Sequence, residues 1–154
     1  MAKPVEPPHV LIDTREQRPW TFSSDTTTEF VTLTEGDYSL AGFSDRVRVE
    51  RKSLADLVGS ITTGRERFLS ECQRLMAFEF RCLIVESRID AVLGHCYRSE
   101  TRPQSVLGSV IALQVDYGLP CIWAGDPVTA ANICERMFRR IRDKWVATAE
   151  ERAA

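Results

Sequence analysis

Short apolar runs separated by polar turns occupy the first third of the chain. They predict strands at residues 10–13, 30–34, 37–40 and 46–52, with a loop at residues 23–29. Because short turns connect most of these segments, we expect the neighbouring strands to form antiparallel pairs. The beginning of the fold should therefore be a small sheet.

The last of these strands has two distinct faces. Side chains alternate across a strand, so Val47 and Val49 lie on one side while Glu50 and Lys52 lie on the other. Arg51 leaves the face that Glu50 occupies. The pattern places one carboxylate and one ammonium group side by side.

The apolar period then changes to that of a helix. Residues 54–61 carry an apolar stripe behind Ser53, a suitable N-cap, and a second stripe runs from residue 68 to residue 76. Pro103 begins a third predicted helix, and Asp126-Pro127 begins the last one. The third helix is expected to bury four side chains: Val106, Leu107, Val110 and Ile111.

Two continuous apolar runs lie between these helices. Residues 82–85 and 121–124 are predicted to be buried strands, the first of them covered on both faces. Residues 94–102 are a looser stretch. This order of elements predicts one α/β domain with three α/β/α layers and a mixed central sheet, antiparallel at its start and parallel at its end.

Composition agrees with a single domain that has a core. The 154 residues are 44% hydrophobic and 27% charged. No apolar run approaches the about 18 residues that cross a membrane, and the N-terminus has no apolar signal core. Five cysteines without Cys-x-x-Cys spacing argue against a disulfide framework or a zinc site. We expect no membrane association and a reducing, intracellular location in the cytoplasm.

Charge limits how the chain can bind nucleic acid. The net charge of −2 excludes a global basic field, so any such binding needs a local patch. The basic residues between positions 136 and 144 are interleaved with Glu135 and Asp143, which indicates the solvated face of the last helix.

Acids and one lysine gather where the predicted strands end. Asp37 follows Gly36 at the head of the third strand, and a hairpin can bring it beside Glu50. Two carboxylates and a phosphate oxygen can hold Mg²⁺, and Lys52 can orient a water or stabilise phosphate charge. Metal-bound water is a better nucleophile for phosphodiester cleavage, and the cation neutralises charge in the transition state. The same spacing also fits solvated acids on a surface strand.

Several motifs resemble the XPF-type structure-specific endonucleases, a family that includes XPF, its MUS relative and archaeal Hef. Gly36-Asp37 and residues 50–56, Glu-Arg-Lys-Ser-Leu-Ala-Asp, match the family signature G-D-x(n)-E-R-K-x-x-x-D. Residues 13–16, Asp-Thr-Arg-Glu, resemble its upstream D-x-R-E. Residues 57–61 and 83–86 resemble neighbouring stretches of the family, so the resemblance extends from about residue 10 to residue 145.

The resemblance implies a restriction-endonuclease-like fold and cleavage of branched, flap or junction DNA with Mg²⁺ or Mn²⁺. It implies a catalytic set of six residues: Asp13, Glu16, Asp37, Glu50, Arg51 and Lys52. Within that set, Asp13, Asp37 and Glu50 are the expected metal ligands. Arg15 and Arg65 are expected to contact DNA, although Arg65 equally fits a solvent-facing arginine.

The expected organisation is a flexible leader at residues 1–9, an XPF-type nuclease domain at 10–146 and a short tail at 147–154. Relatives usually add a tandem helix-hairpin-helix module, which this sequence lacks. We therefore expect a stand-alone domain or a fragment, of bacterial or phage origin. Two copies could pair through an apolar helix face.

Two other functions stay open. A non-catalytic DNA-binding or partner subunit of a nuclease complex should lack Asp37, Glu50 or Lys52, and all three are present. A nuclease specific for RNA would have the same site. His9 and His95 lack the sequence neighbours expected of a general base.

Overall fold

A six-stranded sheet runs through the middle of the computed structural model, which describes residues 6–154. Its strands are β1 (His9–Asp13), β2 (Thr27–Val31), β3 (Tyr38–Leu40), β4 (Val47–Lys52), β5 (Phe80–Val85) and β6 (Cys121–Trp123). They are ordered β2-β1-β3-β4-β5-β6. Strand β3 is antiparallel to both of its neighbours and every other pair is parallel, so the predicted mixed sheet is confirmed.

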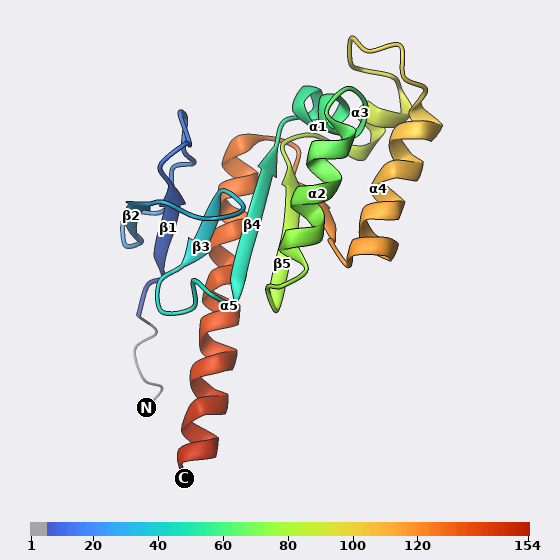
Figure 1. Ribbon diagram of the computed structural model, residues 1–154. Helices are drawn as coiled ribbons and strands as arrows, with labels where there is room; N and C mark the ends of the chain where they lie inside the picture. The colour runs from blue at the N-terminus through green and yellow to red at the C-terminus, as the bar shows by residue number, and fades with distance from the viewer. Residues whose placement is uncertain (1–5) are drawn as a thin grey trace.

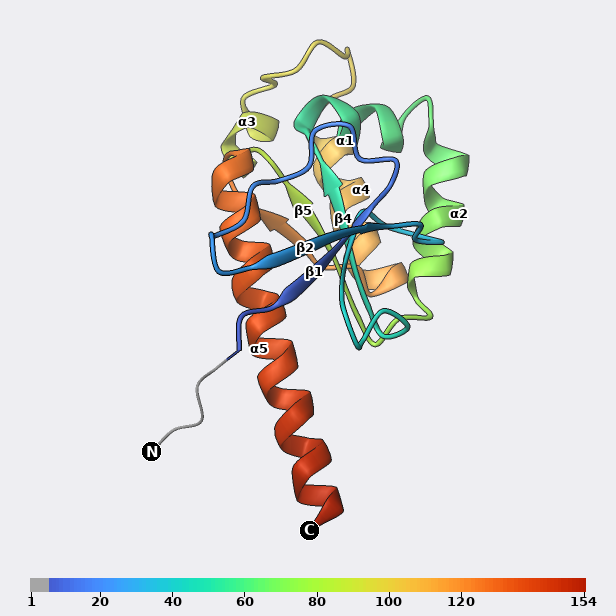
Figure 2. The ribbon, with the colours of Figure 1, turned by 90° about the vertical axis from the view of Figure 1, so that its left-hand side faces the viewer.

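Helices cover both faces of the sheet (Figures 1 and 2). They are α1 (Leu54–Ile61), α2 (Arg65–Leu75), α3 (Ile89–Leu93), α4 (Pro103–Tyr117) and α5 (Pro127–Ala153). The long α5 lies along one face, and the α1–α2 hairpin and α4 lie on the other. The predicted three layers are therefore present.

Alternation along the strands builds a separate apolar core on each face. On the α5 side, Val49 and Ile84 join a cluster that includes Phe138. On the opposite side, Leu83 belongs to a cluster that includes Leu57. Strand β5 contributes to both clusters, which confirms the prediction that it is covered on both faces.

The start of the sheet differs from the prediction in position and direction. Strand β2 begins at Thr27, within the segment expected to be a loop, and ends at Val31 rather than at residue 34. It pairs with β1 in parallel, so the expected antiparallel pair is wrong. Because β2 is an edge strand whose first four residues are exposed, it lacks the alternation that reveals a half-buried strand.

The predicted helix starts are confirmed by their caps. Ser53 Oγ accepts a hydrogen bond from the Asp56 N–H at 3.1 Å, and Asp126 Oδ1 accepts one from the Thr129 N–H at 2.7 Å. Pro103 stands at the first turn of α4, as expected. These local signals locate the helices without tertiary information.

Three burial or element predictions need correction. Ile111 is 54% exposed, so α4 does not bury it. The edge strand β6 is only partly buried. Helix α3 was not predicted because its five residues bury only Val92, too few to show a period.

Regular secondary structure begins before, and ends after, the boundaries predicted for the domain. Of the leader predicted at residues 1–9, residues 1–5 lie outside the described residues, and His9 is the first residue of β1. Helix α5 continues through residues 147–153, which were expected to form a short tail. Among residues 6–154, no helix is both long enough and apolar enough to cross a membrane.

Candidate active site

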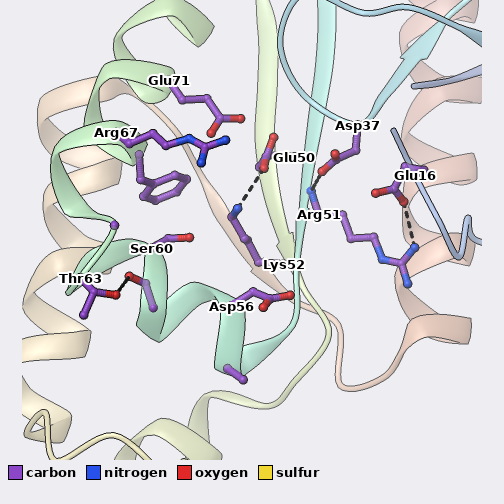
Figure 3. Close-up of a pocket in the computed structure, with 14 residues that line it drawn as sticks. Glu16, Asp37, Glu50, Arg51, Lys52, Asp56, Ser60, Thr63, Arg67 and Glu71 are labelled. Atoms are coloured by element: carbon purple, nitrogen blue, oxygen red, sulfur yellow. Dashed lines mark hydrogen bonds and ion pairs between the residues drawn. The ribbon is translucent and has the colours of Figure 1, made fainter. Parts of the chain in front are cut away.

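A cleft opens at the carboxyl end of β4, between the sheet and the α1–α2 hairpin (Figure 3). Asp37, Glu50 and Lys52 line its sheet side. Arg67 and Glu71 of α2 line the helical side. The cleft thus brings together charged side chains from three separate elements.

The register of β3 and β4 brings Asp37 beside Glu50. Tyr38 pairs with Val49, and the Asp37 N–H donates to the Val49 carbonyl oxygen at 2.9 Å. The backbone N–H of Arg51 donates to Asp37 Oδ2 at 2.8 Å, which orients the carboxylate. The hairpin predicted to join these two acids is therefore present.

Glu50 and Lys52 share one face of β4, as the alternation predicts. Lys52 Nζ lies 3.3 Å from Glu50 Oε1. Glu50 is 4% exposed, and its second oxygen, Oε2, is buried without a hydrogen-bond partner among the described residues. An unpaired buried carboxylate oxygen is costly, so this atom is the natural position for a cation.

Burial and mutual repulsion perturb the titration of these groups. Burial raises the pKa of Asp37 to about 6, and the negative charge of Glu16 adds to the shift. Burial also raises the pKa of Glu50 well above its ordinary value, with further contributions from Asp37 and Glu71. Burial alone lowers the pKa of Lys52, but the carboxylates of Glu50 and Glu71 reverse that shift and raise it. A divalent cation would relieve the same repulsion.

Arg51 turns to the opposite face, toward α5, as the alternation also predicts. Its Nε pairs with Glu86 Oε1, and its Nη1 lies 3.0 Å from Glu16 Oε2. Trp20 Nε1 donates to the same Glu86 oxygen, and the Tyr38 hydroxyl donates to Glu16 at 2.9 Å. Arg51 therefore ties the segment around Glu16 to the strand that carries the site. Glu86 and Trp20 had no predicted role.

Asp13 lies beside the site without lining it. Its backbone N–H donates to the Asp37 carbonyl oxygen at 2.9 Å, but its side chain is used elsewhere. Oδ1 accepts the Leu33 N–H at 3.0 Å and Oδ2 accepts Arg15 Nε at 2.6 Å. Each oxygen of Asp13 thus accepts a hydrogen bond and the side chain does not line the cleft, while its role as a metal ligand stays a prediction. In this structure Asp13 anchors Arg15 and the backbone at Leu33.

Helix α2 presents Arg67, not Arg65, to the cleft. Arg65 Nη1 instead lies 3.3 Å from the Ile61 carbonyl oxygen and 3.3 Å from Ser109 Oγ of α4. Two residues apart on a helix are roughly 200° apart around its axis, so the two arginines diverge. Arg67 and Glu71 were missed: their four-residue spacing places both on one helix face but does not show that this face borders the cleft.

Other candidates from the sequence lie at different places. Asp56, the last residue of the 50–56 motif, lines the cleft near Lys52. His9 pairs with Glu29 on the edge of the sheet. His95 contacts the Ser99 carbonyl oxygen within its own loop. Neither histidine lines the cleft.

The carboxylates suit a hard divalent cation. Asp37 and Glu50 offer the oxygen ligands that Mg²⁺ and Mn²⁺ prefer, and none of residues 6–154 hydrogen-bonds to Glu50 Oε2. Within residues 6–154, no three histidine, cysteine or acidic side chains already surround one point as a ready metal site. A cation would therefore rely on water, substrate oxygens or a further side chain to complete its coordination.

The chain is similar to known proteins in both sequence and structure. Residues 12–137 match the model of the ERCC4 domain. A structure of XPF from Aeropyrum pernix aligns with a TM-score of 0.69 and 28% identity, covering 88% of this chain and 61% of that one. A second, of the same XPF in complex with DNA, aligns with a TM-score of 0.67 and 28% identity, covering 89% and 66%. These matches confirm the resemblance to XPF-type nuclease domains and the restriction-endonuclease-like fold.

A longer relative matches over the same region. A protein from Methanocaldococcus jannaschii, whose name proposes an ATP-dependent RNA helicase, is 30% identical over 131 residues. That alignment covers 84% of this chain but 15% of the relative. The chain spans less than two thirds of each of these three relatives.

Proposed function

Because the chain belongs to the ERCC4 domain family, we propose that it is an endonuclease that hydrolyses phosphodiester bonds in DNA with the help of Mg²⁺ or Mn²⁺. One observation carries this proposal. Asp37, Glu50 and Lys52 meet in one cleft, where a buried oxygen of Glu50 has no hydrogen-bond partner in the described part of the chain. This combination supplies both a cation position and a neighbouring positive charge for the phosphate.

Each residue of the cleft has a distinct task in this proposal. Asp37 and Glu50 would hold the cation, which when bound neutralises phosphate charge and makes water a better nucleophile. Lys52, held 3.3 Å from Glu50, would orient the attacking water or donate to a phosphate oxygen. Arg51 and Glu16 also line the cleft, and there the Arg51 N–H would orient the Asp37 carboxylate while its guanidinium holds Glu16.

The helical wall supports binding of a nucleic-acid backbone. Arg67 projects into the cleft opposite the acids, and the nearby Ser60 and Thr63 add hydroxyl groups. Arginine and hydroxyl side chains are common partners of DNA phosphates. An XPF structure contains DNA, and we extend that ligand to this chain as part of the proposal. The preference for branched, flap or junction DNA rests on the family resemblance.

Pairing of two copies is a further part of the proposal. Ile111 and Val115 of α4 are 54% and 74% exposed, so the helix carries an apolar surface that a second copy could cover. The molecular mass in solution tests this pairing directly.

Cleavage of labelled flap, fork and linear duplex DNA tests the proposed function. With Mg²⁺ or Mn²⁺, we expect wild type to cut the branched substrates. We expect Asp37→Asn and Glu50→Gln each to lower the cleavage rate by a factor of about 100 or more. The control Glu29→Gln changes an exposed acid on β2 and should retain full activity. Equal rates in all four proteins would contradict the assignment. RNA of the same branched shape distinguishes a DNA nuclease from an RNA nuclease.

A further inference from the structure

We propose that Glu71 is a third carboxylate ligand of the cation, supplied by α2 from the wall opposite the sheet. This inference rests on the proposed metal-dependent nuclease function. Glu71 lies outside every motif that resembles the family signature, so only its place in the fold points to it.

The position of Glu71 is the first observation. It lines the cleft with Asp37 and Glu50, and its carboxylate points from α2 toward Glu50 (Figure 3). The three acids come from the turn before β3, from β4 and from α2. They therefore approach the cleft from separate directions, as the ligands of one cation do.

The buried oxygen of Glu50 is the second, independent observation. Lys52 pairs with Oε1, while Oε2 is buried and has no hydrogen-bond partner among the described residues. The Glu71 carboxylate faces Glu50 across the cleft (Figure 3). When both groups are ionised, each carboxylate can only accept hydrogen bonds, so neither can satisfy the other. A cation between them would satisfy both.

The Glu71 carboxylate interacts electrostatically with Lys52 at a longer range than that of an ion pair. Within residues 6–154, none of the ion pairs involves its carboxylate, although Arg67 lies one turn away on α2. The three acids do not yet converge on one point, so the flexible Glu71 side chain must turn toward the cation. Mg²⁺ sites commonly use one or two carboxylates and substrate phosphate. A third carboxylate would hold the cation before DNA arrives.

Metal binding in the absence of DNA tests this role. Mn²⁺ is titrated into wild type, Glu71→Gln and Glu66→Gln, and free Mn²⁺ is measured by electron paramagnetic resonance. We expect Glu71→Gln to weaken Mn²⁺ binding by about tenfold or more. Glu66→Gln is the matched control, because it makes the same change on the same helix outside the cleft and should bind Mn²⁺ as wild type does.

Thermal unfolding separates a metal ligand from a structural acid. The amide introduced by Glu71→Gln can donate to Glu50 Oε2, so the metal-free variant should melt at a higher temperature than wild type. Added Mn²⁺ should raise its melting temperature less than it raises that of wild type. A lower metal-free melting temperature with an unchanged Mn²⁺-induced rise would overturn the role of Glu71.

Mn²⁺ binding and DNA cleavage together distinguish loss of the proposed Glu71 role from loss of the proposed nuclease function. If wild type and Glu71→Gln bind Mn²⁺ equally while Glu50→Gln loses binding, Glu71 is not a ligand and the proposed function stands. If wild type neither binds Mn²⁺ nor cuts DNA, both proposals are overturned.

Discussion

Gly36 sets the geometry of the site at the scale of a single residue. Its backbone has a φ of +74°, in the left-handed region, and a Cβ there would lie 3.3 Å from Arg48 Cδ and from the Val49 carbonyl oxygen. The turn it makes delivers Asp37 to the end of β4, where the Arg51 N–H holds the carboxylate. The glycine of the motif is thus explained by backbone conformation and close packing.

Substituting Gly36 should therefore cost both stability and function. We expect Gly36→Ala to lower the free energy of unfolding by about 1–3 kcal/mol and to weaken Mn²⁺ binding, because the strained turn displaces Asp37. Gly42→Ala is the control: its φ is +83°, but a Cβ there meets nothing within 4 Å. Urea titration should show a larger loss for Gly36→Ala, and equal losses would mean that the close contacts do not constrain the turn.

Individual side chains were predictable where their role depends on the strand itself. Glu50, Arg51 and Lys52 follow from alternation, since side-chain direction along a strand has a period of two. The position of the Asp13 side chain could not be predicted in this way. Leu33 and Arg15 each donate to one of its oxygens, and only the folded backbone brings Leu33 near.

At the scale of elements, Glu135 joins helix α5 to the segment that precedes β2. It is 6% exposed and accepts hydrogen bonds from the Ser23 N–H at 3.2 Å, from the Ser23 hydroxyl and from the Thr26 hydroxyl. Arg139 pairs with it at 3.1 Å. Burial acts to raise the pKa of Glu135, but these bonds outweigh it and lower the pKa.

This network predicts a dependence of stability on pH. Because the folded-state pKa of Glu135 is depressed, its contribution is present above the unfolded-state pKa of about 4.3 and is lost as pH falls through the folded value. Glu135→Gln should destabilise the protein by about 1–2 kcal/mol at pH 7. Denaturant titrations should show this difference shrinking at about pH 3.

An exposed acid provides the comparison for Glu135. Glu100 is exposed in the loop before α4. Glu100→Gln should therefore leave the free energy of unfolding unchanged at neutral and at acidic pH. A loss for Glu135→Gln that is the same at neutral and acidic pH would point to packing, not to the charged hydrogen bonds.

At the scale of the whole molecule, the net charge of −2 leaves DNA binding to local groups. The charged cleft lies on the α1–α2 side of the sheet, and α5 covers the other side. On helix α2, Arg67 lines this cleft, while Arg65 points toward α4. Removing Arg67 should therefore weaken DNA binding more than removing Arg65 does.

Salt titrations of DNA affinity test that expectation. Arg67→Ala should weaken binding of flap DNA and reduce the slope of log affinity against log salt by about one, as loss of one phosphate contact does. Fluorescence anisotropy with Ca²⁺ in place of Mg²⁺ measures the affinity. Arg65→Ala should change the slope less, and the reverse order would place the DNA on α4 instead of in the cleft.

The sequence by itself determined what depends on neighbours along the chain. The faces of β4, the caps Ser53 and Asp126 and the Gly36-Asp37 turn all follow from spacing within one short segment. Only the tertiary structure decided the parallel direction of β2, the use of Asp13 outside the cleft, and the presence of Arg67 and Glu71 within it. These features depend on distances between elements far apart in sequence, which are set when both faces of the sheet bury their apolar side chains against different helices.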